Sequence, residues 1–403
     1  MRSIGQALRD QGGVGPGFDL LRLVLAFSVL FIHCSLWRPA LPDLDLLPLF
    51  PGLPLPAWAF TTAIVPLFFA LSGFLVAGSA ENLRLGDFIA NRALRIVPAL
   101  AVEIALCALL LGPLTTTVPW ATYFSDAQFH RYFLNAFGWI QYELPGVFKD
   151  NPRTDYVNGS LWTVPHEISV YIVLAISIYL GVFQRRSLML CGVVLLFAIA
   201  IATDAANALG LSFPGLKFLT TVFVTRGAAR LVPVFFVGVL FYRYRDKIPF
   251  HGGIAAAATA LYLGAACVFE RETLLGPLGV MLTALIYSYV VAWIGLSPRF
   301  TLRGKTIGII PIGLLAAGDY SYGIYLYGFP LQQTLIHLFP GVWNTAGLFA
   351  ASALVVMSFA AFSWHAIERP VLRLRRRRSA PAATTAPARS YALTPPLTAS
   401  TPS

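Results

Sequence analysis

The sequence predicts an all-α fold, a polytopic membrane helix bundle of about ten transmembrane helices with both termini cytoplasmic. Hydrophobic residues make up 57% of the 403 residues and charged residues only 12%, whereas soluble globular domains carry roughly 45–50% apolar and about 25% charged residues. Most Lys and Arg residues stand in short clusters between long apolar runs, as in membrane proteins. These observations exclude a soluble domain, a disordered chain, a collagen-like repeat and a small disulfide scaffold.

Ten apolar segments come close to the length of a membrane crossing, which needs about 20 mostly apolar residues. The N-terminus has no short apolar run followed by a small-residue cleavage site, so the first segment should remain as a helix. The sixth and seventh segments are short. The expected helices cover roughly 19–38, 58–80, 92–113, 161–181, 187–209, 226–242, 253–268, 274–296, 312–336 and 342–367.

The basic residues set the expected orientation. With the N-terminus inside and an even number of helices, the cytoplasmic side carries 19 Lys and Arg residues and the opposite side carries 8. This asymmetry is what the positive-inside rule describes. Since the bundle is expected to lie in a membrane, we expect membrane lipid as a partner.

Charge and cysteine patterns exclude two further classes of function. The net charge of +11 follows from the cytoplasmic clusters, so we expect no nucleic-acid partner. The four cysteines lie inside apolar segments without CxxC or CxxH spacing, so we expect neither a disulfide framework nor a bound metal.

The chain divides into a membrane domain and a tail. Residues 1–372 form the membrane domain, and residues 373–403 are basic and then rich in Ala, Pro, Thr and Ser, which predicts a disordered cytoplasmic tail. The longest outer connection, 114–160, is rich in aromatic residues and proline, so it should lie on the membrane surface or fold over the bundle. No internal repeat is visible, which argues against a transporter built from inverted halves.

Three ionisable residues lie inside the first expected helix, where such groups are costly and point to function. Arg22 and His33 are eleven residues apart, which places them about 20° apart around the helix axis and about 16 Å apart along it. Asp19 precedes Arg22 by three residues and shares this stripe. The alignment favours a functional face over a packing histidine and an arginine that merely extends to the membrane surface.

The fourth expected helix contains Glu167 in the stretch NGSLWTVPHEISVYIVL. If this helix enters from the outer side near Leu161, Glu167 lies about 9 Å below that surface, and His33 lies at a similar depth. A carboxylate that accepts one ring N–H raises the basicity of the other nitrogen, which gives a general base near neutral pH. The alternative is that Glu167 forms a structural pair with another helix.

Polar residues on further helices are candidates for binding. Arg92 and Arg95 stand one turn apart at the expected cytoplasmic start of the third helix. Arginine side chains suit phosphate binding. The alternative is that these residues only set the orientation of the protein in the membrane. Gly73 and its small neighbours favour close helix packing, and their context is not that of a nucleophilic serine. The candidate substrate contacts are Ser72, Trp162, Tyr322 and Tyr325.

The sequence resembles the acyltransferase-3 membrane family in motifs that follow one another along nearly the whole membrane region. These are the Arg-x10-His spacing of Arg22 and His33, FFALSGFL at Phe68–Leu75, RALR at Arg92–Arg95, GSLWTVPHE at Gly159–Glu167, RLVPVFFVG at Arg230–Gly238, SYGIYLYGFP at Ser321–Pro330 and ERP at Glu368–Pro370. Their order and spacing make the resemblance specific. One departure is Gly328, where many members have histidine.

The resemblance implies a ten-helix bundle that binds acyl-CoA from the cytoplasm. Members transfer acyl groups, commonly acetyl, to hydroxyls of surface polysaccharides, peptidoglycan, nodulation factors or macrolides. We therefore predict a multi-pass O-acyltransferase of the bacterial inner membrane, with acyl-CoA (acetyl-CoA by preference) as donor and a carbohydrate or lipid-linked saccharide as acceptor. Arg92 and Arg95 should meet the nucleotide phosphates, and Arg22 should lie near the pantetheine path.

In the predicted mechanism, His33 removes the proton from the acceptor hydroxyl. Glu167, or Asp19 by longer reach, stabilises the imidazolium, and no metal is needed because CoA thiolate leaves readily. Two other functions fit the residues. One is a polysaccharide or small-molecule transporter or flippase with an intramembrane His, Glu and Arg proton relay, and the other is an inactive scaffold of a polysaccharide export complex.

Overall fold

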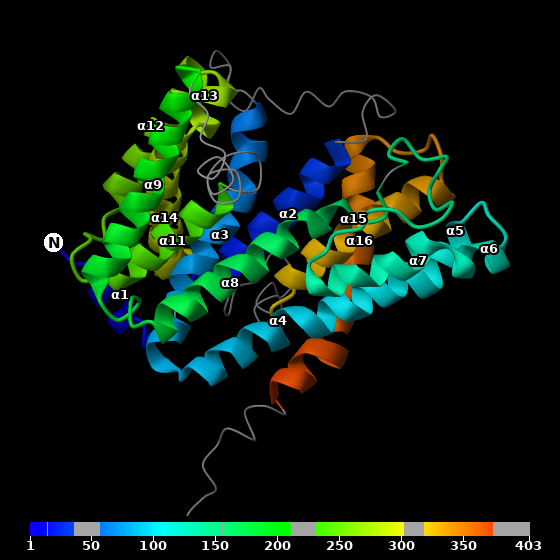
Figure 1. The fold of residues 1–403 in the computed structure, drawn as a ribbon, viewed down its shortest axis with the longest axis horizontal. Helices are drawn as coiled ribbons and strands as arrows, with labels where there is room; N and C mark the ends of the chain where they lie inside the picture. Colours follow the sequence, from blue (N-terminus) through cyan, green and yellow to red (C-terminus); the bar gives the residue numbers. More distant parts are fainter. Residues whose placement is uncertain (14, 36–56, 155, 211–229, 302–317, 374–403) are drawn as a thin grey trace, which may run out of the picture.

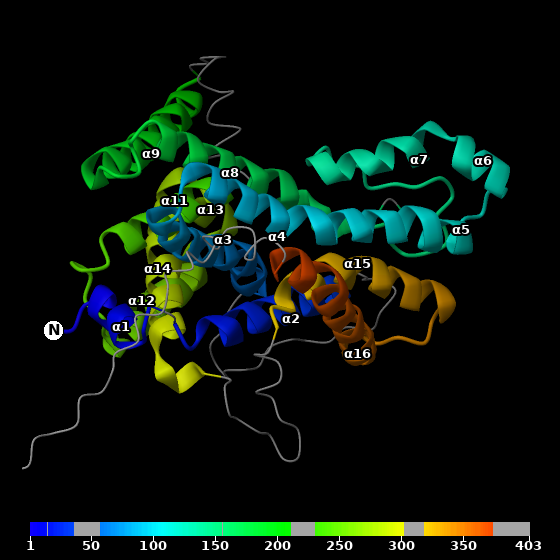
Figure 2. The same cartoon turned by 90° about the horizontal axis from the view of Figure 1, so that it is seen from below.

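The structure is a computed structural model that describes residues 1–13, 15–35, 57–154, 156–210, 230–301 and 318–373 (Figures 1 and 2). Within them the regular structure is helical, apart from two isolated β-bridges, which confirms the all-α fold. The longer helices are α2 (Phe18–Ser35), α3 (Ala57–Asn82), α4 (Leu85–Leu106), α8 (Val164–Tyr179), α9 (Arg186–Ala208), α11 (Leu231–Arg243), α12 (Gly252–Val268), α14 (Pro277–Leu296), α15 (Ser321–Leu338) and α16 (Thr345–Ser363). The shorter helices are α1 (Ile4–Asp10), α5 (Gly112–Thr115), α6 (Trp120–Ser125), α7 (Ala127–Tyr132) and α13 (Arg271–Leu275).

Each segment that was expected to cross the membrane contains one of the longer helices. Among the described residues, 7 helical stretches are long and apolar enough to span a bilayer, and they include α2, α3, α4, α8, α9, α14 and α16. Helices α11 and α12 are apolar but shorter. The chain is therefore a multi-pass membrane protein, whereas ten crossings and two cytoplasmic termini stay predictions. Parts of three expected helices (36–38, 226–229 and 312–317) and the tail from 374 lie outside the described residues.

Helix α4 begins seven residues before the predicted start. The stretch from Leu85 looks like a loop because it contains Asp87, but an acid is favourable in the first turn of a helix, and the next residue, Phe88, is buried. Arg92 and Arg95 therefore lie about 10 and 15 Å along the helix from its start. The predicted position of these arginines at the helix start is wrong, since they lie within the bundle.

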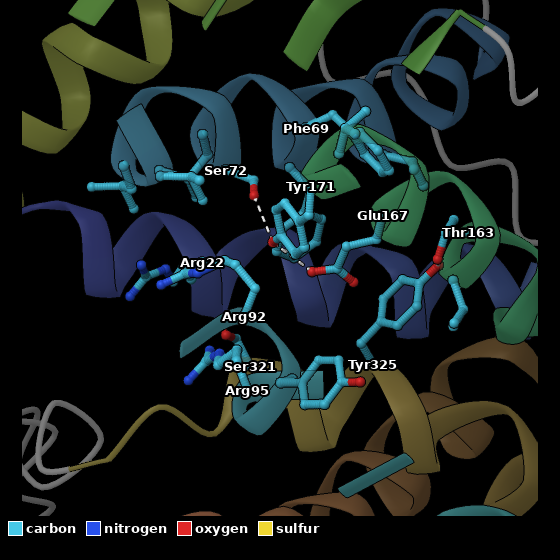
Figure 3. Close-up of a pocket in the computed structure, with 18 of the residues that line it drawn as sticks. Arg22, Phe69, Ser72, Arg92, Arg95, Thr163, Glu167, Tyr171, Ser321 and Tyr325 are labelled. Atoms are coloured by element: carbon cyan, nitrogen blue, oxygen red, sulfur yellow. Dashed lines mark hydrogen bonds between the residues drawn. The ribbon is translucent and has the colours of Figure 1, made fainter. Parts of the chain in front are cut away.

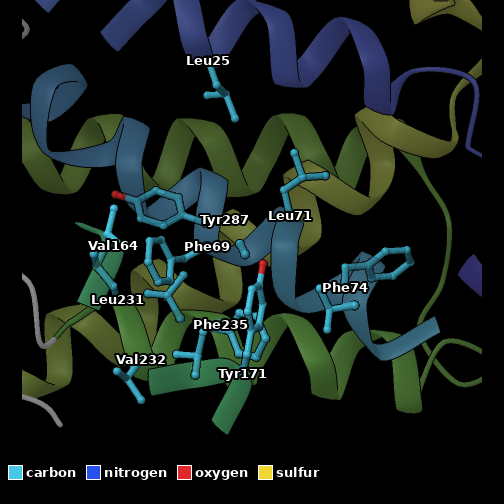
Figure 4. Close-up of a cluster of buried hydrophobic side chains, with 14 of the residues drawn as sticks. Leu25, Phe69, Leu71, Phe74, Val164, Tyr171, Leu231, Val232, Phe235 and Tyr287 are labelled. Carbon is cyan, nitrogen blue, oxygen red and sulfur yellow. The ribbon is translucent and has the colours of Figure 1, made fainter. Parts of the chain in front are cut away.

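Two glycines let α3 and α11 approach backbone to backbone. A side chain at Gly73 would collide with the carbonyl of Phe235, and one at Gly238 would collide with the carbonyl of Ala70. This confirms the close packing predicted for Gly73. Leu71, Phe74 and Phe235 fill the surrounding core (Figure 4). The contact holds α3 against α11. It also holds Ser72, which lies between the contacting residues Ala70 and Gly73 on α3.

The connection 114–160 folds over the bundle. Helices α5, α6 and α7 continue from the end of α4 and turn back along it (Figure 2). The ring of Tyr123 is buried, and its hydroxyl donates a 2.8 Å hydrogen bond to the carbonyl of Ala108. Phe137 and Trp139 are 82% and 71% exposed, which suits aromatic side chains at a membrane interface.

Candidate active site

Five helices line a cavity of about 160 Å³ (Figure 3). Pockets for drug-sized ligands have about 300–1,000 Å³, so this cavity accepts a small group and not a whole nucleotide. The fold brings seven of the predicted site residues together in it. They are Arg22 of α2, Ser72 of α3, Arg92 and Arg95 of α4, Glu167 of α8, and Tyr322 and Tyr325 of α15.

Asp319, just before α15, holds two of the arginines. Its Oδ2 atom accepts hydrogen bonds from Arg95 Nη2 at 2.6 Å and Arg22 Nη1 at 3.2 Å. The Asp319 side chain is only 17% exposed, so these charge-assisted bonds are shielded from water. Asp19 lies at the edge of this cluster, 3.6 Å from the same Arg22 atom, and is 42% exposed.

Asp319 is not among the site residues predicted from the sequence. The signal was available, because an ionisable residue inside an expected membrane helix is costly and points to function. Asp319 lies inside the expected helix 312–336, and the same reasoning that selected Asp19 and Glu167 selects it.

Arg92 has a different environment from the other two arginines. Its guanidinium carbon lies 5.8 Å from the centre of the Tyr171 ring, a cation–π contact. Its Nε atom is buried and has no hydrogen-bond partner among the described residues. Arg92 is therefore the cavity arginine best able to receive an anionic group.

Glu167 faces the cavity at the end of a short hydrogen-bond chain (Figure 3). The hydroxyl of Tyr171, one turn further along α8, donates to Glu167 Oε1 at 2.8 Å. The same hydroxyl lies 3.1 Å from Ser72 Oγ on α3. The chain joins α8 to α3 across the cavity and gives Ser72 a tyrosine partner in place of an imidazole.

The two tyrosines of α15 anchor the opposite wall. Tyr325 donates to the carbonyl of Ser160 at 3.2 Å, and its hydroxyl lies 2.8 Å from Thr163 Oγ1. Tyr322 donates to the carbonyl of Ile96 at 3.2 Å. Trp162 does not line this cavity, and its ring instead packs edge-on against His166. The predicted position of Trp162 in the site is therefore wrong, because adjacent side chains of this turn point in different directions.

His33 does not line the cavity that Glu167 faces, and among the described residues no hydrogen bond joins the two side chains, so the predicted pairing is not formed. The His33 ring packs edge-on against Phe329, with 5.2 Å between ring centres, one turn beyond Tyr325 on α15. Its Nδ1 atom is buried without a hydrogen-bond partner among the described residues. Glu167 lies instead in the cavity that Arg92 and Arg95 line.

A second cavity of about 340 Å³ adjoins the first and shares Arg22 and Leu75 with it. Its walls come from α1, the start of α2 and the end of α3, and they include Asp19. Arg9 fixes α1 by a 2.7 Å hydrogen bond to Asp246, and this contact lowers the pKa of the Asp246 carboxyl below its usual value. The two cavities are therefore neighbours, with Arg22 of the arginine cluster between them.

The acyltransferase domain family matches residues 16–365 of this chain. The chain belongs to the acyltransferase-3 family. It is similar to nodulation protein 10 of Rhizobium leguminosarum bv. viciae, with 27% identity over 92% of this chain and 97% of that protein. It is also similar to the O-acetyl transferase of Shigella phage Sf6, with 27% identity over 88% of this chain and 95% of that protein. No solved structure matches the chain.

The protein is therefore an O-acyltransferase, and the geometry of its cavity can be interpreted for acyl transfer. The carbonyl oxygen of an acyl donor gains negative charge in the transition state, and positioned donors stabilise that charge. In this acyltransferase Arg95 lines the cavity and can supply such a donor, whereas the buried Nε atom of Arg92 is available to a different, anionic group. Ser72 lacks the adjacent imidazole that would activate it as a nucleophile, so the described geometry favours direct attack by the acceptor.

Proposed function

We propose that this O-acyltransferase transfers an acyl group, acetyl by preference, from acyl-CoA to a hydroxyl of a carbohydrate or lipid-linked saccharide in the bacterial inner membrane. The observation that carries the proposal is the small arginine-lined cavity with the second cavity beside α1 next to it. The volume of about 160 Å³ suits an acetyl thioester better than a long acyl chain. The name of one relative, the O-acetyl transferase of Shigella phage Sf6, supports the acetyl group.

The donor-binding proposal rests on how the three arginines are paired. Asp319 accepts from Arg22 and Arg95, whereas Arg92 has a buried Nε atom without a partner among the described residues. An acyl-CoA that enters through the second cavity brings phosphate charges toward this cluster. Arginine forks bind phosphate strongly, so we assign the main phosphate contact to Arg92.

For the chemical step, we assign the general base to His33, which packs against Phe329, one turn beyond the cavity residue Tyr325. The acceptor hydroxyl must therefore enter the cavity at its Tyr325 end to meet this base. Its Nδ1 atom accepts the proton of the acceptor hydroxyl while the hydroxyl oxygen forms a bond to the thioester carbonyl. The carbon–sulfur bond then breaks, CoA leaves as a thiolate, and the proton on His33 is released to solvent or to the thiolate. Glu167 and its Tyr171 partner orient the cavity wall next to Arg92, whose guanidinium lies over the Tyr171 ring. Asp19 serves at the entrance by positioning Arg22.

The test measures release of CoA thiol and transfer of radiolabelled acetyl from acetyl-CoA, using purified protein and glycolipids extracted from bacterial membranes. Arg92→Ala should raise the KM for acetyl-CoA by about 10- to 100-fold, since a lost charge-assisted phosphate contact costs about 1.5–3 kcal/mol. Arg84→Ala is the matched control, because Arg84 is exposed at the start of the same helix and does not line the cavity. Equal KM values in both variants would remove Arg92 from donor binding.

A second variant tests the base. His33→Ala should abolish acetyl transfer while the protein inserts and accumulates normally. Full transfer activity in this variant would exclude His33 as the base. Absence of both thiol release and labelled product in the wild-type protein would refute the proposed donor and acceptor together.

A further inference from the structure

Helix α15 contains a proline that leaves one backbone carbonyl without its helical partner. Pro330 has no N–H group, so the carbonyl of Leu326, four residues earlier, receives no hydrogen bond from it. The side chain of Asn158 fills this role and donates to the Leu326 carbonyl at 2.9 Å. Asn158 is completely buried, so this bond does not compete with water.

Asn158 also binds two other elements. Its amide nitrogen donates to Glu103 Oε1 of α4 at 2.8 Å, and its amide oxygen accepts from the backbone N–H of Ser160 at 2.9 Å. The two N–H donors of the amide therefore bind α15 and α4, and its oxygen binds a third segment. The third segment is the 3-10 turn Gly159–Thr163, which leads directly into α8.

Glu103 is a buried acid that the proposed mechanism does not use. It is 0% exposed, and no ion pair joins it to a Lys or Arg within the described part of the chain. Its Oε1 atom accepts from the Cys107 thiol at 3.0 Å as well as from Asn158. A carboxyl at such a position is costly, and its bond to Asn158 gives it a structural task.

The turn that Asn158 fixes contacts Tyr325 on one wall of the cavity and leads into the helix that carries Glu167. The Ser160 carbonyl and the Thr163 hydroxyl bind the hydroxyl of Tyr325. Glu167 follows Thr163 by one helical turn and therefore lies on the same side of α8. A shift of this turn along α15 would move Tyr325 and Glu167 relative to the arginines of α4.

We propose that Asn158, supported by Glu103, is a positioning residue that sets where α8 begins and so places Glu167 and Tyr325 in the catalytic cavity. The inference rests on the proposed function, because it takes this cavity as the place of acyl transfer. A displacement of about 1 Å in a catalytic site can cost about 100-fold in rate. The predicted signature is a loss in kcat with little change in donor binding.

The experiment compares Asn158→Leu with Asn151→Leu. Asn151 is a matched control because it is also buried and donates to an α15 carbonyl, that of Gln333 at 2.9 Å, but it lies before the turn and outside the cavity. Asn158→Leu should lower kcat for acetyl transfer about 100-fold and leave the KM for acetyl-CoA within threefold. Hydrogen exchange of amides 159–168 should become faster in this variant and stay unchanged in Asn151→Leu.

Two further variants separate positioning from simple hydrogen-bond satisfaction. Adding Pro330→Ala to Asn158→Leu returns an N–H to the Leu326 carbonyl, so it should restore thermal stability but not kcat. Glu103→Gln keeps an acceptor for Asn158 and should stay within threefold of wild-type kcat. Glu103→Leu leaves Asn158 in place, should lower kcat about tenfold, and keeps the test valid if Asn158→Leu does not fold.

Three outcomes would overturn the proposal. These are a kcat within threefold of wild type in Asn158→Leu, an equal loss in Asn151→Leu, or recovery of kcat on adding Pro330→Ala. Hydrogen exchange reports the position of the turn without any substrate. An inactive wild-type protein with normal exchange behaviour would therefore count against the proposed function and not against the positioning role.

Discussion

The ion pair between Asp319 and Arg95 should be a major stabilising contact of the cavity. The two atoms lie 2.6 Å apart, and the side chains are 17% and 24% exposed, so water screens them only partly. Removing one partner from a buried pair costs about 3–5 kcal/mol because the other charge is left uncompensated. The remaining exposure places the expected loss for Asp319→Ala at the lower end, about 3 kcal/mol.

A double-mutant cycle measures this pair directly. Asp319→Ala and Arg95→Ala should each destabilise the protein in detergent, and the double variant should cost little more than either one. The expected coupling is about 1–3 kcal/mol, as for contacting residues in one network. Denaturant unfolding of the four proteins, followed by circular dichroism, provides the free energies.

A surface pair serves as the control for this cycle. Arg2 and Asp10 lie 2.7 Å apart, but their side chains are 42% and 60% exposed. Asp10→Ala should therefore change stability by less than about 1 kcal/mol. If the losses for Asp319→Ala and Arg95→Ala add to within about 0.5 kcal/mol, the two residues act independently and the cluster does not hold the cavity together.

Three other predictions follow from the fold and the site. Gly73→Ala should lower stability by about 1–3 kcal/mol through contact with α11, whereas Gly192→Ala, which meets open space, should not; equal thermal unfolding of the two variants would contradict the close packing. Glu167→Gln keeps an acceptor for its tyrosine partner, so the protein should stay folded and, since Glu167 has an orienting role, acetyl transfer should stay within about tenfold of wild type; a loss of about 100-fold or more would show that the carboxylate takes part in proton transfer. With the exposed native cysteines replaced, a cysteine at Ser125 should react with an impermeant reagent from outside and one at Ser187 should not; the opposite pattern would invert the topology.

The sequence predicted the helices well because membrane crossing imposes a strong physical rule. A long apolar run with few charges has almost no alternative to a helix in lipid, so each expected segment contains one where the structure describes it. The start of α4 was misplaced because amphipathic turns at a membrane surface carry charges such as Asp87, and these resemble loop residues.

The candidate site was predictable in its members and not in its geometry. The cost of ionisable groups in lipid selected Arg22 and Glu167, and it would also have selected Asp319. The relation of Glu167 to His33 depended on where the fourth helix begins, and that is decided by buried bonds from Asn158 to α4 and α15. Such contacts join residues far apart in sequence, and no local pattern reveals them.

The charge distribution around the cavity explains why one arginine is the best candidate for the donor. Asp319 compensates Arg22 and Arg95, so these two groups are already stabilised without ligand. Arg92 lies over the Tyr171 ring, shares the cavity with Glu167, and has a buried Nε atom without a hydrogen-bond partner among the described residues. An anion bound there would offset the cost of burying this charge. A neutral acyl ester would not offset this cost. The site should therefore bind an acyl donor with phosphate groups more tightly than a neutral acyl ester.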